Sequence, residues 1–393
     1  MQNGRFFSYL NTAESLVTKY QGDQPLHHFL KSFFRENSKY GSRDRKQISK
    51  LCYACFRTGG AWKSLEIKEK ILASLFLCQD EPDELLAVLR PEWKDHFEKH
   101  LSDKLSFLEN LDLRLPVNEV FPLYDHISGQ MTSRDEFILS HLIQPRLFLR
   151  VRPGKEETVE AKLRTARIPF NIYGNTIELP NGTDIAPVLT TDLDVVVQDL
   201  SSQRTAEYVS AALQAVGKKA KVWDCCAASG GKSIMTYDLD SSIDLTVSDI
   251  RPAILHNLSG RFERAGIKKY RSFVADLSNA NAGSQLYDLV IADVPCSGSG
   301  TWGRTPEELC FFSMQKLEHY NKLQQGILKN IEHNIKPGGV LLYFTCSVFR
   351  DENEAMVEFI VQNSKLVLSS MELVSGWESR ADTMFMAMFT SPA

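Results

Sequence analysis

Five short apolar runs in the second half of the chain each end on a polar residue. These residues are Asp224, Asp249, Asp276, Asp293 and Thr345. A short apolar run closed by turn residues is typical of a buried strand in a parallel sheet. Amphipathic stretches such as residues 315–334 separate the runs, and this alternation predicts a doubly wound α/β sheet. We therefore expect the five polar residues at one rim of the sheet, where open α/β sheets bind their ligands.

The part of the chain before this sheet has a different pattern. Residues 1–140 show helical spacing of apolar side chains, with a helix expected to begin near Ser42. Beyond Pro145 the pattern predicts strands over residues 147–152, 170–173 and 176–179 and a helix over residues 156–166. The length is too great for one ordinary core, and we expect domains at residues 1–140, 145–195 and 196–393.

The chain has the composition of a soluble globular protein, with 43% hydrophobic and 24% charged residues. Its longest apolar run, residues 71–78, is too short to cross a bilayer, and no apolar leader follows the first residues. The eight cysteines form no disulfide framework of the kind found in small secreted domains. We expect a cytoplasmic protein without membrane partners, with a monomer as the default state.

Basic residues gather in two segments, although the net charge is only -4. Residues 1–60 carry ten Lys and Arg against four Asp and Glu. The small α/β unit carries seven, namely Arg146, Arg150, Arg152, Lys155, Lys162, Arg164 and Arg167. Both segments could attract the phosphates of a nucleic acid, and a solvated protein surface is the plainer alternative.

Cys52 and Cys55 have the spacing of half a zinc site. No second pair or histidine partner follows at a suitable distance, so a buried helix face is the better interpretation. We therefore expect no metal ion.

Cys296 and Cys346 stand just beyond two of the apolar runs. Cys296 lies in the segment Asp-Val-Pro-Cys-Ser-Gly that begins at Asp293, and Cys346 lies in Thr-Cys-Ser. Since the carboxyl ends of parallel strands meet at one rim, we expect both thiols there, close enough to act on one substrate atom.

The run that ends at Asp224 leads into a turn of small residues, Cys-Cys-Ala-Ala-Ser-Gly-Gly-Lys-Ser. Its glycines let the backbone approach a ligand closely. A phosphate-binding P-loop would need glycine where Cys226 stands, and the dinucleotide pattern G-x-G-x-x-G is absent. Asp249, 18 residues beyond Gly231, is placed to hold ribose hydroxyls, whereas Asp224 and Asp276 could instead cap helices.

Taken together, these motifs resemble the RNA (cytosine-5)-methyltransferases of the Sun/Nop type. The similar segments are residues 224–233 (D-x-C-A-A-P-G-G-K-T), 293–301 (D-A-P-C-S-G-x-G), 336–354 (K-P-G-G…T-C-S…E-N-E) and 198–202 (Q-D-x-x-S). Residues 41–53 are similar to the NusB-like helical domain of the bacterial ribosomal-RNA members, the RsmB branch. The chain departs from the family at Ser229 (proline), Arg152 (asparagine) and Thr383 (glycine), and the segment before Thr383 is short.

The resemblance implies a Rossmann-like methyltransferase domain that uses S-adenosylmethionine, a small α/β RNA-binding subdomain and a NusB-like RNA-binding domain. Cys346 would add to carbon 6 of cytosine, Asp293 would hydrogen-bond the base, and Cys296 would assist loss of the carbon-5 proton and release of Cys346. The cofactor contacts carried over are Cys226, Ala227, Ala228, Ser229, Gly230, Gly231, Lys232, Asp249, Asp276 and Asp293.

Three alternatives stay open beside methylation of ribosomal RNA. The substrate could be transfer RNA, with the target cytosine single-stranded or flipped in either case. A DNA cytosine-5 methyltransferase would use Cys296 as nucleophile and leave Cys346 unexplained. A protein of another class, an RNA-binding ribosome-assembly factor, would bind RNA without methyl transfer.

Overall fold

The computed structural model describes residues 2–280 and 282–393, which form two compact units. The helical unit comprises Met1–Asp125, Thr132–Gln144 and Thr301–Met314, and the sheet unit comprises His126–Met131, Pro145–Gly300 and Gln315–Ala393. Residues 301–314 thus pack with the helices, although the sequence pattern placed them in the last domain. The backbone N–H of Leu26 donates to Glu307 Oε1 at 2.9 Å, and Trp302 stacks on Phe121.

The helical unit contains α1 (Gln2–Lys19), α2 (Leu26–Glu36), α3 (Ser42–Arg57), α4 (Ile67–Cys78), α5 (Glu84–Leu89), α6 (Leu101–Glu109), α7 (Val117–Val120), α8 (Arg134–Ser140) and α14 (Glu308–Phe311). Helix α3 begins at the predicted Ser42, where Asp44 Oδ2 accepts a hydrogen bond from the backbone N–H of Gly41 at 2.8 Å. Cys52 and Cys55 are buried on this helix, as expected. No group of metal-binding side chains occurs in the described part of the chain.

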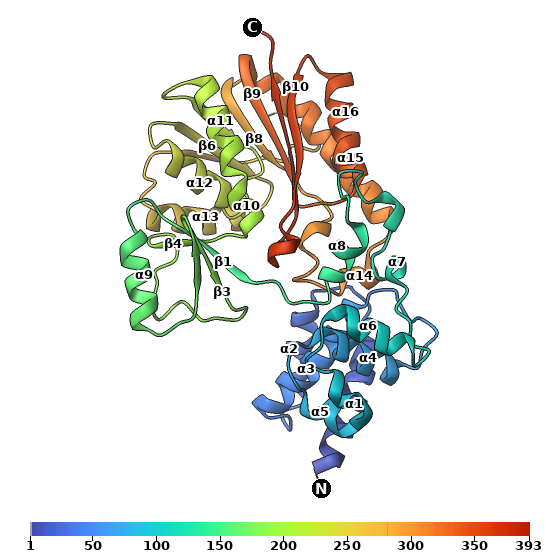
Figure 1. The fold of residues 1–393 in the computed structure, drawn as a ribbon. Helices are drawn as coiled ribbons and strands as arrows, with labels where there is room; N and C mark the ends of the chain where they lie inside the picture. Colours follow the sequence, from blue (N-terminus) through green and yellow to red (C-terminus); the bar gives the residue numbers. More distant parts are fainter. Residues whose placement is uncertain (1, 281) are drawn as a thin grey trace. The chain divides into compact units, whose positions relative to one another are not determined.

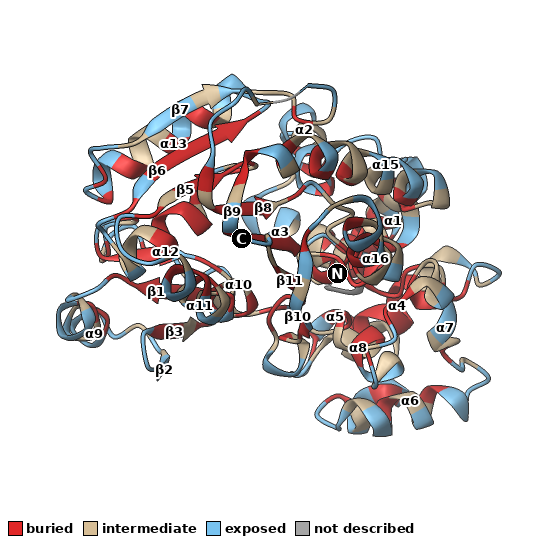
Figure 2. Cartoon of the chain, turned by 90° about the horizontal axis from the view of Figure 1, so that it is seen from above, coloured by how far each residue is buried: buried red, intermediate tan, exposed pale blue. Residues whose placement is uncertain are grey.

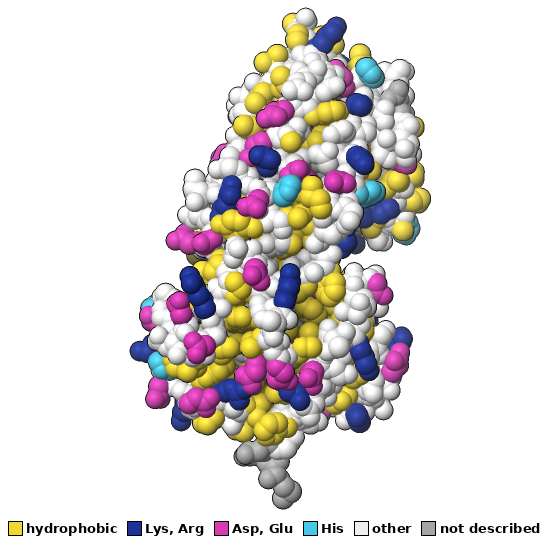
Figure 3. All heavy atoms as spheres, turned by 90° about the vertical axis from the view of Figure 1, so that its right-hand side faces the viewer, with side chains coloured by type: hydrophobic (Ala, Val, Ile, Leu, Met, Phe, Trp, Pro, Cys, Tyr) yellow, Lys and Arg dark blue, Asp and Glu magenta, His cyan; other side chains and the backbone are white. Residues whose placement is uncertain are grey.

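The basic amino-terminal segment is partly neutralised by the acidic segment that follows it. Arg43 pairs with Glu84 at 3.1 Å, and Lys50 pairs with the buried Asp83 at 2.6 Å. On the face drawn in Figure 3, cationic and anionic side chains are interspersed, with no broad region of one sign. The count of basic residues in this segment therefore overstates its attraction for phosphate.

The sheet unit contains two sheets and the helices that cover them. Its strands are β1 (Leu147–Val151), β2 (Asn171–Tyr173), β3 (Thr176–Leu179), β4 (Val195–Val197), β5 (Lys221–Asp224), β6 (Asp244–Asp249), β7 (Arg271–Val274), β8 (Tyr287–Asp293), β9 (Ile335–Thr345), β10 (Val367–Val374) and β11 (Met384–Thr390). Its helices are α9 (Glu156–Thr165), α10 (Leu200–Arg204), α11 (Ala206–Val216), α12 (Gly231–Leu239), α13 (Pro252–Arg264), α15 (Met314–Ile331) and α16 (Glu354–Asn363).

The larger sheet has the strand order β10-β11-β9-β8-β5-β6-β7, and its last five strands run parallel. Helices α11, α12 and α13 pack their apolar side chains on one face, while α15 and α16 lie on the other (Figure 1). Figure 2 shows the central strands as buried and the outward helix surfaces as exposed. The doubly wound α/β fold expected from the sequence is confirmed.

Two features of this sheet differ from the expectation. Strand β7 ends at Val274, so Asp276 lies in the following turn, where Ser278 and Asn279 donate to its carboxylate. Strands β10 and β11 pair antiparallel, and β11 joins the edge of β9, a hairpin that the sequence analysis did not predict. Methionines at alternate positions of β11 gave it no clear strand signature.

The smaller sheet, in the order β2-β3-β1-β4, is antiparallel and packs on α9 through its own apolar core. Two of its arginines point into the protein: Arg150 and Arg152 form buried ion pairs with Asp238 of α12, at 2.6 and 2.7 Å. Arg152 also donates to the carbonyl oxygens of Asp192 and Ala265. Three further pairs are Arg146–Glu178, Lys162–Asp194 and Arg164–Glu160. Arg150 and Arg152 therefore join the two sheets and are not exposed to RNA.

Replacement of Asp238 by alanine should destabilise the sheet unit strongly, because it leaves two buried guanidinium groups without their carboxylate. Loss of one partner of a buried pair costs about 3–5 kcal/mol. The matched control is Asp244→Ala, which removes the exposed partner of Arg271 and should cost about 0–1 kcal/mol. Urea denaturation of the two variants measures the difference, and equal midpoints would contradict a structural role for the Asp238 pairs.

Candidate active site

The turn after β5 is held in a shape that only certain residues allow. Ala228 and Gly230 have left-handed φ values of 45° and 84°. A Cβ on Gly230 would lie 2.9 Å from Cε1 of Phe262, so glycine is required there. Ser229, at the family's proline position, accepts hydrogen bonds from Arg261 through its carbonyl oxygen (2.8 Å) and its hydroxyl (3.0 Å). The serine thus ties the turn to α13.

Asp249 braces the same turn from the end of β6. Its Oδ2 accepts a hydrogen bond from the backbone N–H of Ala228 at 3.0 Å, and Arg251 Nε donates to Oδ1 at 2.9 Å. Burial alone would raise the pKa of Asp249, but the hydrogen bonds from Arg251 and Ala228 outweigh it and lower the pKa. The carboxylate is therefore ionised, with the exposed side chain of Ile250 beside it in sequence.

Two other aspartates stand at neighbouring strand ends in contrasting surroundings. Asp293 is about one-third exposed and pairs with the buried Lys232 at 2.8 Å. Asp224 is fully buried, accepts from Ser233 Oγ at 2.5 Å, and has no described partner for Oδ1. Burial raises the pKa of Asp224 to about 7. Asp293 can thus meet a ligand, whereas Asp224 supports the turn from below.

Cys296 and Cys346 are brought together at the ends of β8 and β9. These strands are adjacent and parallel, with Asp293 opposite Phe344, and the two Sγ atoms lie 3.3 Å apart. The hydrogen bond between the thiols, together with burial, raises the pKa of Cys296. The expected proximity is therefore present, and Cys296 holds its proton next to Cys346.

A single buried carboxylate, that of Glu352, connects the two cysteine loops. Its Oε1 accepts from the backbone N–H of Ser297 at 2.8 Å, and its Oε2 accepts from Ser347 Oγ at 2.5 Å and from Ser297 Oγ. Burial raises the pKa of Glu352, an effect that these donors oppose. Because each serine directly follows one of the cysteines, Glu352 fixes the separation of the two thiols.

Side chains from α15 and from the segment after Cys346 complete this support. Gln324 Nε2 donates to the carbonyl oxygen of Pro295 at 3.0 Å and to Glu352 Oε1 at 3.1 Å. Asn353 accepts from Thr345 Oγ1 at 2.7 Å and donates to the carbonyl oxygen of Ser347 at 2.9 Å. The sequence analysis matched Glu352 and Asn353 to E-N-E without giving them a task, and it did not notice Gln324. No local signal links Gln324 to the loops, because its partners are distant in sequence.

The segment before β11 closes over the cysteine loops. The Gly300 N–H donates to the Cys346 carbonyl oxygen, and the Thr383 N–H donates to the Gly300 carbonyl oxygen, both at 2.9 Å. A Cβ on Gly300 would lie 1.9 Å from the Thr383 carbonyl oxygen, so the approach requires glycine. Thr383 fits in place of the family glycine because the contact uses its backbone, although its Oγ1 is buried without a described partner.

The Q-D-x-x-S motif anchors that segment from the other side. Asp199 Oδ1 accepts from the backbone N–H of Asp382 at 3.1 Å, and Ser201 Oγ donates to the Asp382 carbonyl oxygen at 2.6 Å. Ser202, the serine matched to the motif, instead accepts from Gln198 at 3.1 Å. The contact to the cysteine-loop segment is therefore made by Ser201, one residue earlier than the motif suggested.

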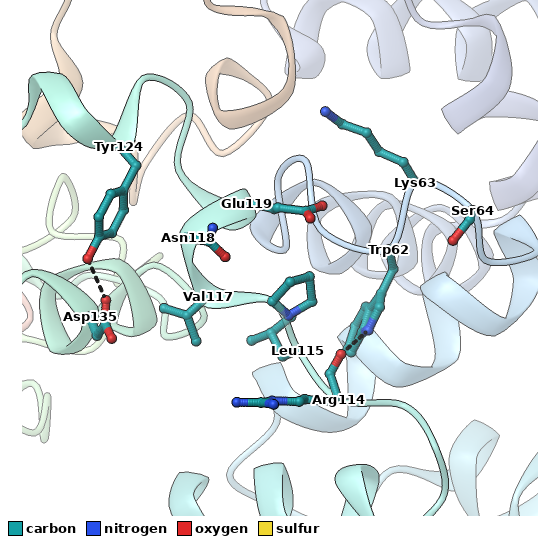
Figure 4. A pocket seen from close by; sticks show the side chains of 11 residues that line it. Trp62, Lys63, Ser64, Arg114, Leu115, Val117, Asn118, Glu119, Tyr124 and Asp135 are labelled. Carbon is teal, nitrogen blue, oxygen red and sulfur yellow. Dashed lines mark hydrogen bonds between the residues drawn. The ribbon is translucent and has the colours of Figure 1, made fainter.

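A separate hollow of about 710 Å³ lies on the helical unit and is lined by residues of that unit alone (Figure 4). The indole N–H of Trp62 donates to the Arg114 carbonyl oxygen at 2.9 Å, and Tyr124 donates to Asp135 at 3.0 Å. Its charged lining residues are Lys63, Arg114, Glu119 and Asp135. Cations and anions balance, so the hollow favours no ligand class.

This fold and this arrangement of side chains define a methyltransferase of the Rossmann-like class. Residues 210–389 match the family described as 16S rRNA methyltransferase RsmB/F, and over these residues the chain belongs to that family. The ribosomal RNA small subunit methyltransferase B of Xylella fastidiosa is 34% identical over 167 residues, which are 42% of this chain and 38% of that protein. Its counterpart in Xanthomonas campestris is 32% identical over 174 residues, covering 44% and 39%. The match thus spans about two-fifths of these relatives.

Solved structures share the fold at low identity. The crystal structure of PH0851 superposes with a TM-score of 0.68 at 17% identity and covers 97% of this chain and 98% of that one. NSun6 from Pyrococcus horikoshii superposes with a TM-score of 0.59 at 16% identity, covering 70% and 100%. No helix in the described residues is long and apolar enough to span a membrane.

Mild oxidation with hydrogen peroxide should join Cys296 and Cys346 in a disulfide, since their Sγ atoms are 3.3 Å apart. Two thiols and one peroxide give the disulfide and two waters. Peptide mapping by mass spectrometry under non-reducing conditions reads the product, and Cys346→Ala provides the blank. A crosslink between Cys225 and Cys226 in its place would show that the catalytic-loop geometry is wrong.

Glu352→Ala should slow this crosslink, because the two serine anchors lose their common acceptor and the loops separate. The matched control is Glu354→Ala, which removes a nearby carboxylate that accepts from Ser128 and contacts neither cysteine loop. The rate of disulfide formation at fixed peroxide is the measurement. Equal rates in the two variants would mean that Glu352 does not set the thiol separation.

Proposed function

We propose that this protein methylates carbon 5 of cytosine in RNA, with S-adenosylmethionine as the methyl donor and ribosomal RNA as the substrate. The observation that carries the proposal is the pair of thiols 3.3 Å apart on two loops held by one buried carboxylate. A lone buried cysteine needs no function, but two thiols positioned together beside an accessible aspartate suit covalent catalysis. The family match over residues 210–389 supports the same reaction.

The residues at the rim fit S-adenosylmethionine. A Cβ on Gly231 would meet no atom within 4 Å, so the space before the turn is open, and Asp249 presents an ionised carboxylate beside it. The turn of residues 226–232 would follow the methionine part, Asp249 would hold the ribose hydroxyls, and Ile250 and Asp276 would border the adenine. When bound, the donor supplies a methyl group on a positive sulfonium.

Cys346 is proposed as the nucleophile. Its thiolate adds to carbon 6 of the cytosine, and the electron pair of the carbon 5–carbon 6 double bond makes carbon 5 nucleophilic. Asp293, held by Lys232, accepts hydrogen bonds from the amino edge of the ring and draws charge in that direction. These two residues explain how a weakly nucleophilic ring carbon can take a methyl group.

Cys296 is proposed to complete the reaction after methyl transfer. Carbon 5 then carries both a methyl group and a proton. Cys296 removes that proton as its own proton passes to the sulfur of Cys346, the ring double bond re-forms, and the bond from Cys346 to carbon 6 breaks. The raised pKa of Cys296 keeps its proton in place until this step.

Ribosomal RNA is favoured over transfer RNA by the description of the matching family and of the curated relatives. The target cytosine must be single-stranded or flipped, because the thiol approaches the face of the ring. The helical unit is proposed as a NusB-like RNA-binding domain. The small sheet is proposed as an RNA-binding subdomain, with a cytoplasmic monomer as the working form.

Cys346→Ala should abolish methyl transfer, by about 10⁴-fold or more, and should form no covalent complex. Cys296→Ala should instead accumulate a protein–RNA adduct, since release fails after addition. Both variants are incubated with labelled S-adenosylmethionine and undermodified 16S or transfer RNA and run on denaturing gels. The matched control is Cys310→Ala, which alters an exposed cysteine outside the site.

The pattern of adducts separates the alternatives. An adduct with Cys346→Ala alone would assign the nucleophile to Cys296, as in the DNA enzymes. Methylation of transfer RNA alone would change the substrate, and tight RNA binding without transfer by the wild type would favour an assembly factor.

A further inference from the structure

The free side of the small sheet carries a hollow that the proposed reaction does not use. Strand β2 pairs with β3 through Asn171–Tyr173, and all three of its residues are exposed. Figure 2 shows β2 at the outer edge of its sheet. The hollow has a volume of about 690 Å³ and is lined by Arg164, Arg167, Ile168, Pro169, Phe170, Asn171, Ile172 and Tyr173.

The chemistry of this lining is one-sided. Both of its charged residues, Arg164 and Arg167, are cationic, and no carboxylate lines the hollow. Two aromatic rings stand beside them: Tyr173 is 58% exposed, and the Arg164 guanidinium lies 5.5 Å from the centre of the Phe170 ring. Cations interleaved with exposed rings are what a single nucleic-acid strand requires, since bases stack on rings and phosphates pair with cations.

Arg167 occupies a backbone position that favours glycine. It follows the carboxyl end of α9 with a φ of 56°, and the next residue, Ile168, donates its N–H to the Leu163 carbonyl oxygen at 3.1 Å. Helix ends of this shape normally use glycine, because a side chain is strained there. Arg167 makes no side-chain hydrogen bond or ion pair with the described part of the chain. Its guanidinium therefore has no structural task that would explain the strain.

Most other basic residues of the small α/β unit are committed to ion pairs within the protein. Arg150 and Arg152 bind Asp238, Lys162 binds Asp194, and Arg146 binds Glu178. The cationic charge left for a ligand on this unit is thus concentrated at the hollow, beside the rings.

We propose that this hollow, the β2 groove, binds a single-stranded segment of RNA, with bases stacked on Tyr173 and Phe170 and a phosphate on Arg167. The inference rests on the proposed function, because the strand would belong to the same RNA that carries the target cytosine. A peptide strand could pair with the edge of β2, but it would not require two arginines and two exposed rings.

The test measures binding of the full-length protein to a fluorescent single-stranded RNA of about 12 nucleotides by anisotropy at several salt concentrations. Arg167→Gly removes the cation and relieves the strained φ, so it should fold at least as well as the wild type. Tyr173→Ala removes an exposed ring, and Tyr173→Phe keeps it. The matched control is Lys365→Ala, an exposed cation on the same unit but outside the groove.

We expect Tyr173→Ala to weaken binding about tenfold and Tyr173→Phe to leave it unchanged, since a stacked base contributes through the ring. Arg167→Gly should weaken binding and reduce the slope of log affinity against log salt by about 0.7, the loss of one phosphate contact to a single strand. Wild-type affinity and slope in both Arg167→Gly and Tyr173→Ala would overturn the inference. So would an equal loss in Lys365→Ala, which would mean that charge acts without a defined site. Binding of an acidic peptide in the groove, with RNA affinity unchanged, would assign it to a protein partner.

Binding is measured without S-adenosylmethionine, so its outcome is separate from that of the methylation assay. If the wild type methylates RNA while the groove variants bind normally, the groove is wrong and the function stands. If the wild type transfers no methyl group but the variants still lose affinity, the groove stands and the reaction is wrong.

Discussion

The active site depends on one carboxylate buried between two loops. Glu352 accepts hydrogen bonds from Ser297 and Ser347, and each of these serines follows a cysteine. A charge at that depth is tolerated only because its oxygens are satisfied, so the protein cannot relax one loop without exposing the other to an unmet acceptor. Gln324 adds a further donor from α15, which links the spacing of the thiols to the helix layer on that face of the sheet.

The remainder of the rim follows the same logic of indirect support. Lys232 is spent on Asp293, Arg251 on Asp249 and Arg261 on Ser229, so each group that faces the ligand space is held by a neighbour from another element. Such support holds reacting groups in position before the substrate arrives, which is the main contribution a protein makes to transfer chemistry. The departures from the family pattern, at Ser229 and Thr383, are accommodated because their contacts are made largely by backbone atoms.

Much of this was predictable from the sequence where local pattern decides the outcome. Strands β5, β6, β8 and β9 end at the residues where their apolar runs end, and parallel pairing then puts Cys296 beside Cys346. Pairings between distant residues were not predictable. The counting of basic residues suggested that Arg150 and Arg152 face RNA, but Asp238 lies some ninety residues away and takes both. Strand β11, rich in methionine, carried no β signature and forms only because β9 offers it an edge.

The path of the chain between the two units has an evolutionary meaning. The helical unit takes residues 301–314 from the middle of the catalytic sequence, where Trp302 and Leu309 are buried. A gene fragment that started at Pro145 would encode every rim residue and still leave those apolar side chains without their partners. The helices cannot therefore have been added or lost as an interchangeable module by simple fusion at one boundary. The two units must mutate in step, and a recombination event between them is constrained at several crossings of the chain.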